Sequence, residues 1–139
     1  MTKRKRYALL FTVLTFITPP AFSFLFSGEI NVMNITRDDA SFVLRNASSG
    51  RTWGRSLDSE QSTLVPQEDA TEFYFSTQLN DQLCIMCSSS IEPDQSIATI
   101  VLDPAGKDKF SCLMITSTGQ TKRIIGKHTE NRLPDCAAL

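Results

Sequence analysis

Four cysteines carry the clearest chemical signal in this chain, at positions 84, 87, 112 and 136. Cys84 and Cys87 have the spacing of the reactive pair in thiol oxidoreductases. Such a pair draws its reactivity from a helix N-terminus, whereas residues 83–88 have the composition of a strand. We therefore interpret the cysteines as structural disulfides of an exported protein, and a periplasmic thiol oxidoreductase using Cys84 and Cys87 is the enzymatic alternative.

The sequence leaves three disulfide connectivities open. If residues 83–88 form a regular strand, Cys84 and Cys87 point to opposite faces and must pair elsewhere, with Cys112 and Cys136. A turn between them would instead let Cys84 and Cys87 bond to each other. Cys136 lies near the end of the chain, so we expect its disulfide to fasten the C-terminal tail to the domain.

Other residue types that support catalysis or metal binding lack the necessary spacing. His128 is the single histidine, and no Gly-x-Ser-x-Gly motif is present to place a nucleophile near it. Cys112 and Cys136 lack the close spacing of a second ligand pair in a zinc site. The sequence predicts no catalytic residue, no metal and no cofactor, and we expect a protein that is not an enzyme.

Acidic pairs and glycosylation sequons give weaker signals. The pairs at 38–39, 68–69 and 92/94 lie in turn-like stretches without the ligand spacing of a calcium loop, and we expect them to be solvated. The sequons begin at Asn34 and Asn46, and they matter if the host is eukaryotic.

The cysteines and polar groups described above must be positioned by short runs of residues that either alternate between apolar and polar or favour β-strands. The runs are separated by turns such as Asn80-Asp81 and Thr118-Gly119, a spacing typical of an all-β fold. We predict a small antiparallel β-sandwich or barrel-like domain stapled by disulfides, with a helical turn or loop over Asp58–Pro66 and a meander formed by the last three strands. The predicted strands cover 30–34, 41–45, 51–57, 71–77, 83–87, 97–102, 110–116 and 121–125.

The N-terminal segment predicts export. The 139 residues allow one ordinary domain, and their net charge is −1. Lys3 to Arg6 form a basic block, an apolar run follows, and Ala21-Phe22-Ser23 resembles a signal-peptidase site. We expect a signal peptide at 1–23 and one β-rich domain at 24–139. The alternative is that residues 7–26 remain as a membrane anchor, since their length is close to that of a bilayer span.

Charge is unevenly distributed after the predicted cleavage site. Residues 24–139 hold 10 Lys and Arg against 15 Asp and Glu, a net charge of −5. The stretch between Arg55 and Lys107 has no Lys or Arg, and six basic residues lie from Lys107 onward. This balance argues against a general nucleic-acid-binding protein.

The segment Ile97–Lys127 resembles the C-terminal β-domain of minor pseudopilins, the H-type pseudopilins of type II secretion and their type IV pilus relatives. The shared pattern is an apolar strand, a Ser/Thr turn, Gly119 and a basic strand with Lys122 and Arg123. Gln120 departs from that pattern because an Arg is typical there. The resemblance implies no enzymatic activity and packing against other pilins, and in some relatives the basic strand contacts DNA. Two charges give little affinity for nucleic acid on their own.

Together these observations predict an exported, periplasmic or extracellular β-domain that acts by protein–protein contact in a bacterial cell-envelope, pilus or secretion assembly. Its partners would be other envelope or surface proteins, with membrane contact only if the N-terminal segment is retained. Lys122, Arg123 and Trp53 are candidate contact residues, because Trp and Arg are enriched at interface hot spots. The alternative is a free-standing, disulfide-stapled binding or inhibitor module. Trp53, Phe73, Tyr74 and Phe75 are candidate anchors, and we expect at least two of them to belong to the core.

Overall fold

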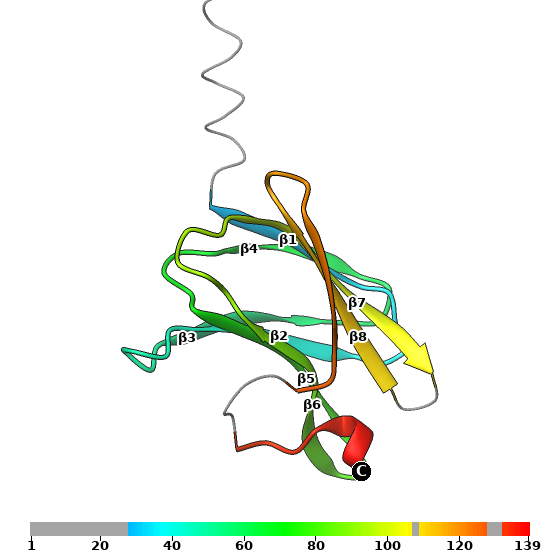
Figure 1. The fold of residues 1–139 in the computed structure, drawn as a ribbon. Coiled ribbons are helices and arrows are strands. Elements are labelled where there is room, and N and C mark those ends of the chain that lie inside the picture. The colour runs from blue at the N-terminus through cyan, green and yellow to red at the C-terminus, as the bar shows by residue number, and fades with distance from the viewer. Residues whose placement is uncertain (1–27, 107–108, 128–131) are drawn as a thin grey trace, which may run out of the picture.

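The computed structural model describes residues 28–106, 109–127 and 132–139, which form nine strands and one short 3₁₀ helix (Figure 1). The predicted signal peptide and His128 lie outside these residues. In the described part of the chain, no helix is long and apolar enough to cross a membrane. The elements are β1 (Glu29–Asn34), β2 (Ala40–Arg45), β3 (Thr52–Leu57), β4 (Ser62–Pro66), β5 (Glu72–Leu79), β6 (Gln82–Ser90), β7 (Ile97–Gly106), β8 (Lys109–Thr116), β9 (Thr121–Ile125) and η1 (Cys136–Ala138).

The strands form two sheets that pack face to face, which confirms the predicted all-β, disulfide-stapled sandwich. One sheet has five strands in the order β4-β1-β7-β8-β9, and the other has four in the order β3-β2-β5-β6. Neighbouring strands pair antiparallel except β1 and β7, which are parallel. The predicted meander is present, because β7, β8 and β9 follow one another in both sequence and sheet order.

The core lies between the sheets and is built by the period-two alternation of each strand. Phe42 on β2 is fully buried, and its ring centroid lies 5.0 Å from that of Phe75 and 5.9 Å from that of Phe73. Phe73 and Phe75 are also fully buried, so two of the four candidate aromatic anchors are core residues, as predicted.

Residues 58–66 contain a strand instead of the predicted helical turn or loop. β4 pairs with β1 at the edge of the five-stranded sheet, with Val65 opposite Ile30. Val65 is buried and Leu64 is exposed, which is ordinary strand alternation. The prediction was wrong because the run is only five residues long and ends in Pro66. A proline argues against a strand within a sheet, since it has no N–H to donate to a neighbour, but it is tolerated in an edge strand such as β4.

All four cysteines are bonded, in the pairs Cys84–Cys136 and Cys87–Cys112. Of the three connectivities that the sequence left open, the chain has the one in which Cys84 and Cys87 each bond to a distant cysteine, and Cys136 fastens the C-terminal tail as expected. The regular strand that would have placed Cys84 and Cys87 on opposite faces is not present. Phe75 lies opposite Cys87 and Thr77 lies opposite Cys84, so a bulge in β6 places both cysteines on the same face.

The C-terminal segment also covers the free edge of β6. Ile85 forms a bridge with Asp135, and its N–H donates to the Pro134 carbonyl oxygen at 2.8 Å. Cys87 forms a second bridge with Gly126, directly after β9. These contacts join the edges of the two sheets on this side and leave β3 and β4 as the edge strands on the other side.

Candidate contact site at Trp53 and Arg51

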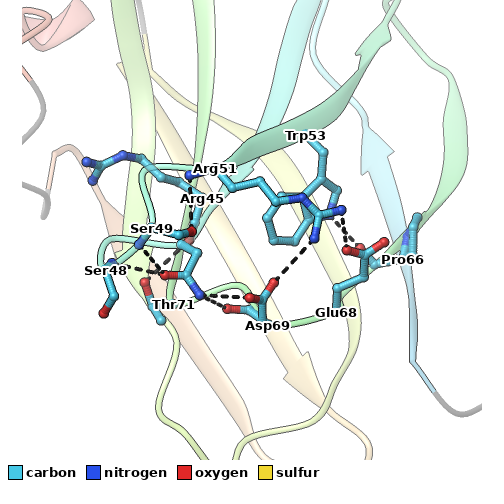
Figure 2. Close-up of polar contacts among 10 residues, drawn as sticks. Arg45, Ser48, Ser49, Arg51, Trp53, Pro66, Glu68, Asp69 and Thr71 are labelled. Carbon is cyan, nitrogen blue, oxygen red and sulfur yellow. Dashed lines mark hydrogen bonds and ion pairs between the residues drawn. The ribbon is translucent and has the colours of Figure 1, made fainter.

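Two loops meet at one end of the β3–β4 edge of the sandwich. The hairpin between β2 and β3 contains residues 46–51, and the connection between β4 and β5 contains residues 67–71. Figure 2 shows Arg51 lying against Trp53, with Glu68 and Asp69 from the other loop reaching toward Arg51. Because Arg51 and Trp53 are two residues apart on an extended segment, their side chains project from the same face.

Trp53 joins the edge strands of the two sheets. Its indole N–H donates to the Pro66 carbonyl oxygen on β4 at 2.8 Å, and its ring packs against the core cluster. By register Trp53 lies opposite Leu44, which is fully buried, so the ring faces inward from the edge of the four-stranded sheet. Trp53 therefore closes the gap between the sheets while one side of its ring stays accessible.

Arg51 covers that accessible side. Its guanidinium carbon lies 4.9 Å from the centroid of the Trp53 ring, which is within the range of a cation–π contact. Nη2 lies 2.7 Å from Oε2 of Glu68, and Nη1 lies 3.9 Å from Oδ1 of Asp69. The Arg51 side chain remains 56% exposed, so the stacked guanidinium is held in place and still faces solvent.

Asn46 fixes the hairpin that presents Arg51. Its Oδ1 accepts from the backbone N–H groups of Ser48 and Ser49 at 2.9 and 3.0 Å, the arrangement of an Asx turn. Its Nδ2 donates to the carbonyl oxygen and to Oδ2 of Asp69 at 2.9 and 3.0 Å. One side chain thus links the two loops, and Asp69 is held between Asn46 and Arg51.

A second set of contacts ties the hairpin to β5. The Ala47 N–H donates to Oγ1 of Thr71 at 2.9 Å, and the Thr71 N–H donates to the Arg45 carbonyl oxygen at the same distance. Arg45 also forms an ion pair with Glu72 on the neighbouring strand. The hairpin is therefore fixed at its base as well as at Asn46.

The arrangement offers groups that can take part in recognition. Among the residues that the structure describes, no group of three or more His, Cys, Asp or Glu is placed to hold a metal ion. The site offers a planar cation on an aromatic ring with two flanking carboxylates, which can bind a polar or charged surface. Each exposed ion pair or cation–π contact contributes about 1 kcal/mol or less to stability, so the fold gains little from this ordered cluster.

The other candidate contact residues lie elsewhere. Lys122 and Arg123 are on β9, which is at the opposite edge of the sandwich from β3. Arg123 Nη1 donates to Oδ2 of Asp103 at 3.1 Å and to Oγ of Ser111 at 3.0 Å, so much of its charge is already compensated. Tyr74 is half-buried on β5. The structure therefore does not bring the basic strand and Trp53 together.

The two sequons differ in environment. Asn34 is fully buried, and its Nδ2 donates to the carbonyl oxygens of Asp38, Leu57 and Asp58 at 2.8, 3.1 and 3.3 Å. Its Oδ1 accepts from both the N–H and the hydroxyl of Thr36. The Asn34 sequon is thus a structural turn in the folded chain, whereas Asn46 lies at the surface, half-buried in the hairpin.

Sequence reasoning identified Trp53 and missed the residues that hold it. Residues 46–50 lie between the predicted strands 41–45 and 51–57, and the pair 68–69 was expected to be solvated, but nothing indicated that the two segments meet. The period-two spacing of Arg51 and Trp53 could have predicted their stacking. The contact with Glu68 and Asp69 depends on the edge position of β4, which was not predicted.

These features define the chain as an all-β sandwich domain with two disulfides, which is typical of proteins from non-reducing, exported compartments. No family model matches the chain, and no curated protein or solved structure matches it either.

Proposed function

We propose that this chain is an exported, non-enzymatic β-domain that acts by protein–protein contact, as a component of a bacterial cell-envelope, pilus or secretion assembly. The observation that carries the proposal is the exposed stack of Arg51 on Trp53, held by Glu68 and Asp69. Arg and Trp are the residues most enriched at interface hot spots. A guanidinium already fixed by its neighbours loses little conformational entropy when a partner binds it.

The disulfides support an exported location and favour a structural role for the cysteines. Cys84 and Cys87 are fully buried and each is bonded to a distant partner, whereas a thiol oxidoreductase needs an accessible pair that opens and closes. The resemblance of residues 97–127 to minor pseudopilins is the reason for naming a pilus or secretion assembly. The assignment to a pilus or secretion assembly and the choice between the periplasm and the cell exterior are the most specific parts of the proposal.

The test is whether the chain occurs in a larger particle and whether Arg51 holds it there. In the cell that makes the protein, the native chain should be recovered in a complex larger than the purified chain, and Arg51→Ala should shift it toward the free form. Arg55→Ala is the matched control, because Arg55 is exposed on β3, the strand that follows the hairpin, and has no ion pair within the described residues.

The free-standing binding or inhibitor module is the competing function, and the same experiment distinguishes it. Such a module would be recovered at the size of the purified chain and would still use the Trp53–Arg51 surface against a soluble target. Recovery of the native chain only as a free species would therefore contradict the envelope-assembly proposal. Release of the chain by mild reductant together with measurable disulfide exchange would instead support the oxidoreductase.

A further inference from the structure

A concave pocket lies on the outer face of the four-stranded sheet, at the end away from the Trp53–Arg51 site. Its volume is about 510 Å³, which is within the range of small-molecule sites. Asp38 and Asp39 enter it from the turn before β2, and Asp58 enters it from the turn after β3. Residues of β5 and β6 complete the pocket, so four segments of the chain contribute to it.

Register places three serines in one row across the pocket. Ser41 on β2 lies opposite Ser56 on β3 and opposite Ser76 on β5, and directly opposed residues share a face. Ser41 is exposed, so the row faces outward from the sandwich. All three serines line the pocket, and each hydroxyl can donate to or accept from a bound ligand.

The Ser76 hydroxyl lacks the hydrogen bond that its burial requires. The residue is only 6% exposed, and buried hydroxyls in folded proteins are ordinarily hydrogen-bonded. Within the described residues, no group donates to the Ser76 hydroxyl or accepts from it. Because Ser76 lines the pocket, a ligand that enters the pocket can supply the missing partner.

The aspartates give the pocket a negative charge that nothing beside it compensates. No Lys or Arg lines the pocket, and none of the three aspartates forms an ion pair in the part of the chain that the structure describes. Oδ1 of Asp39 accepts from the Ser59 N–H at 2.9 Å, whereas the carboxylates of Asp38 and Asp58 have no such bond among the described residues. Three carboxylates around one concave space attract a ligand with several positive charges.

The segments that carry the aspartates are held in place before a ligand enters. The buried Asn34 side chain connects them, because its Nδ2 donates to the carbonyl oxygens of Asp38 and Asp58 at 2.8 and 3.3 Å. Oγ1 of Thr77 on β5 donates to the Asp39 carbonyl oxygen at 2.7 Å. A pocket with ordered walls loses less conformational entropy when a ligand binds.

We propose that this pocket binds a linear aliphatic polyamine. Its ammonium groups lie at the three aspartates and one of them donates to the Ser76 hydroxyl, since an ammonium has three donors. Leu83 is 43% exposed and offers an apolar contact to the methylene groups between the charges. The site is separate from the Trp53–Arg51 surface and adds a ligand to the contact function.

Other ligands fit the pocket less well. A metal ion is disfavoured because, in the described ranges, no three His, Cys, Asp or Glu residues are placed to hold one. A sugar ring would find no aromatic side chain on which to stack among the lining residues. The lysine side chain of a partner protein would bring one ammonium to three carboxylates.

The test is an NMR titration of the purified, ¹⁵N-labelled chain, with its disulfides intact, against spermidine. The backbone amide signals of Ser41, Ser76 and Gln78 should shift and saturate, with a dissociation constant between about 10 µM and 1 mM. Diacetylspermidine has the same skeleton and only one charge, and it should bind at least about tenfold more weakly, the effect of roughly 1.4 kcal/mol. Raising NaCl from about 0.05 to about 0.5 M should weaken spermidine binding, because salt screens the charges.

Two variants test the residues of the pocket without disturbing the fold. Asp58→Asn should weaken spermidine binding at least about fivefold, because it removes one of the carboxylates. Ser76→Ala should weaken it at least about twofold and leave the thermal midpoint of the free chain unchanged or raised, because the lost hydroxyl had no partner. Asp94→Asn is the matched control and should bind like the wild type. Asp94 is exposed in the loop after β6, at the opposite end of that strand from Leu83.

Several results would overturn the proposal. They are the absence of saturable shifts with spermidine up to about 10 mM, unchanged affinity in either Asp58→Asn or Ser76→Ala, and an equal loss in Asp94→Asn. Tighter binding of the tripeptide Gly-Lys-Gly than of spermidine would overturn it in favour of a lysine side chain. None of these results bears on the Arg51→Ala experiment, which measures a complex with other proteins in the cell.

Discussion

The indole N–H of Trp53 donates to the carbonyl oxygen of Pro66 at 2.8 Å, and this bond joins the edge strand of one sheet to the edge strand of the other. At the opposite edge the sheets are joined through Cys87, which bonds to Cys112 and also bridges Gly126. The sandwich is thus closed on both sides by specific contacts, and the Trp53 side also carries the proposed contact site.

Loss of the Trp53 hydrogen bond should weaken the fold without abolishing it. Trp53→Phe keeps most of the ring packing and removes the donor to Pro66, so we expect a cost of about 1–2 kcal/mol. Urea unfolding followed by circular dichroism measures it, because the variant has no tryptophan fluorescence. Tyr74→Phe on the outer sheet face should change stability by less than about 0.5 kcal/mol. Equal stability of Trp53→Phe and wild type would contradict the joining role.

Gly54 is required by a close approach of β3 to β2. A Cβ built at Gly54 would overlap the backbone carbonyl oxygen of Phe42, and backbone cannot move aside as a flexible side chain does. Gly54→Ala should therefore destabilise the domain by about 1–3 kcal/mol. Ser56→Ala, two residues along the same strand and exposed, is the control and should be nearly neutral. A neutral Gly54→Ala would mean that the two strands are further apart.

The two disulfides should contribute similar amounts to stability. The bonded cysteines are 52 residues apart in Cys84–Cys136 and 25 apart in Cys87–Cys112. Chain entropy then predicts losses of about 4 and about 3.5 kcal/mol when each pair is replaced by alanine. The first replacement should also speed hydrogen exchange at the Ile85 amide, which bonds to Pro134 in the tail. Exchange at Ile85 that is unchanged after loss of Cys136 would show that the tail holds its place without the disulfide.

Asn34 should be more sensitive to substitution than other asparagines on the surface. Asn34→Ala removes bonds to three backbone carbonyls and to Thr36 in a fully buried position, and we expect a cost of about 2–4 kcal/mol. Asn31→Ala on the same strand, where the side chain is half-exposed, is the control and should cost less than about 1 kcal/mol. Thermal melts of both variants give the comparison, and similar midpoints would contradict a structural role for Asn34.

The all-β class could be predicted because turn residues and period-two alternation are local signals. The same alternation located eight of the nine strands approximately and the meander of β7, β8 and β9. The parallel pairing of β1 with β7 could not be predicted, since it joins segments more than 60 residues apart through tertiary packing. The bulge near Met86 was equally hidden, because bulges depend on the neighbouring strand as well as on the bulged one.

The candidate site was predictable only in part for the same reason. Trp53 stood out by residue type. Glu68 and Asp69, the ion-pair partners of Arg51, follow β4, and they meet Arg51 only because β4 lies at the sheet edge beside β3. The turn-like local sequence around Glu68 and Asp69 predicted that both carboxylates would be solvated. Their ion pairs with Arg51 arise from long-range packing, which the local sequence does not indicate.

Site-specific photo-crosslinking in the cell that makes the protein tests the proposed contact function most directly. A photo-reactive residue at Ser49, which is exposed in the hairpin beside Arg51, should give a discrete adduct with another protein. The same residue at Asp81, in the β5–β6 turn at the other end of the four-stranded sheet, should give none. Absence of an adduct at Ser49, or equal adducts at both positions, would contradict a protein contact at Trp53 and Arg51.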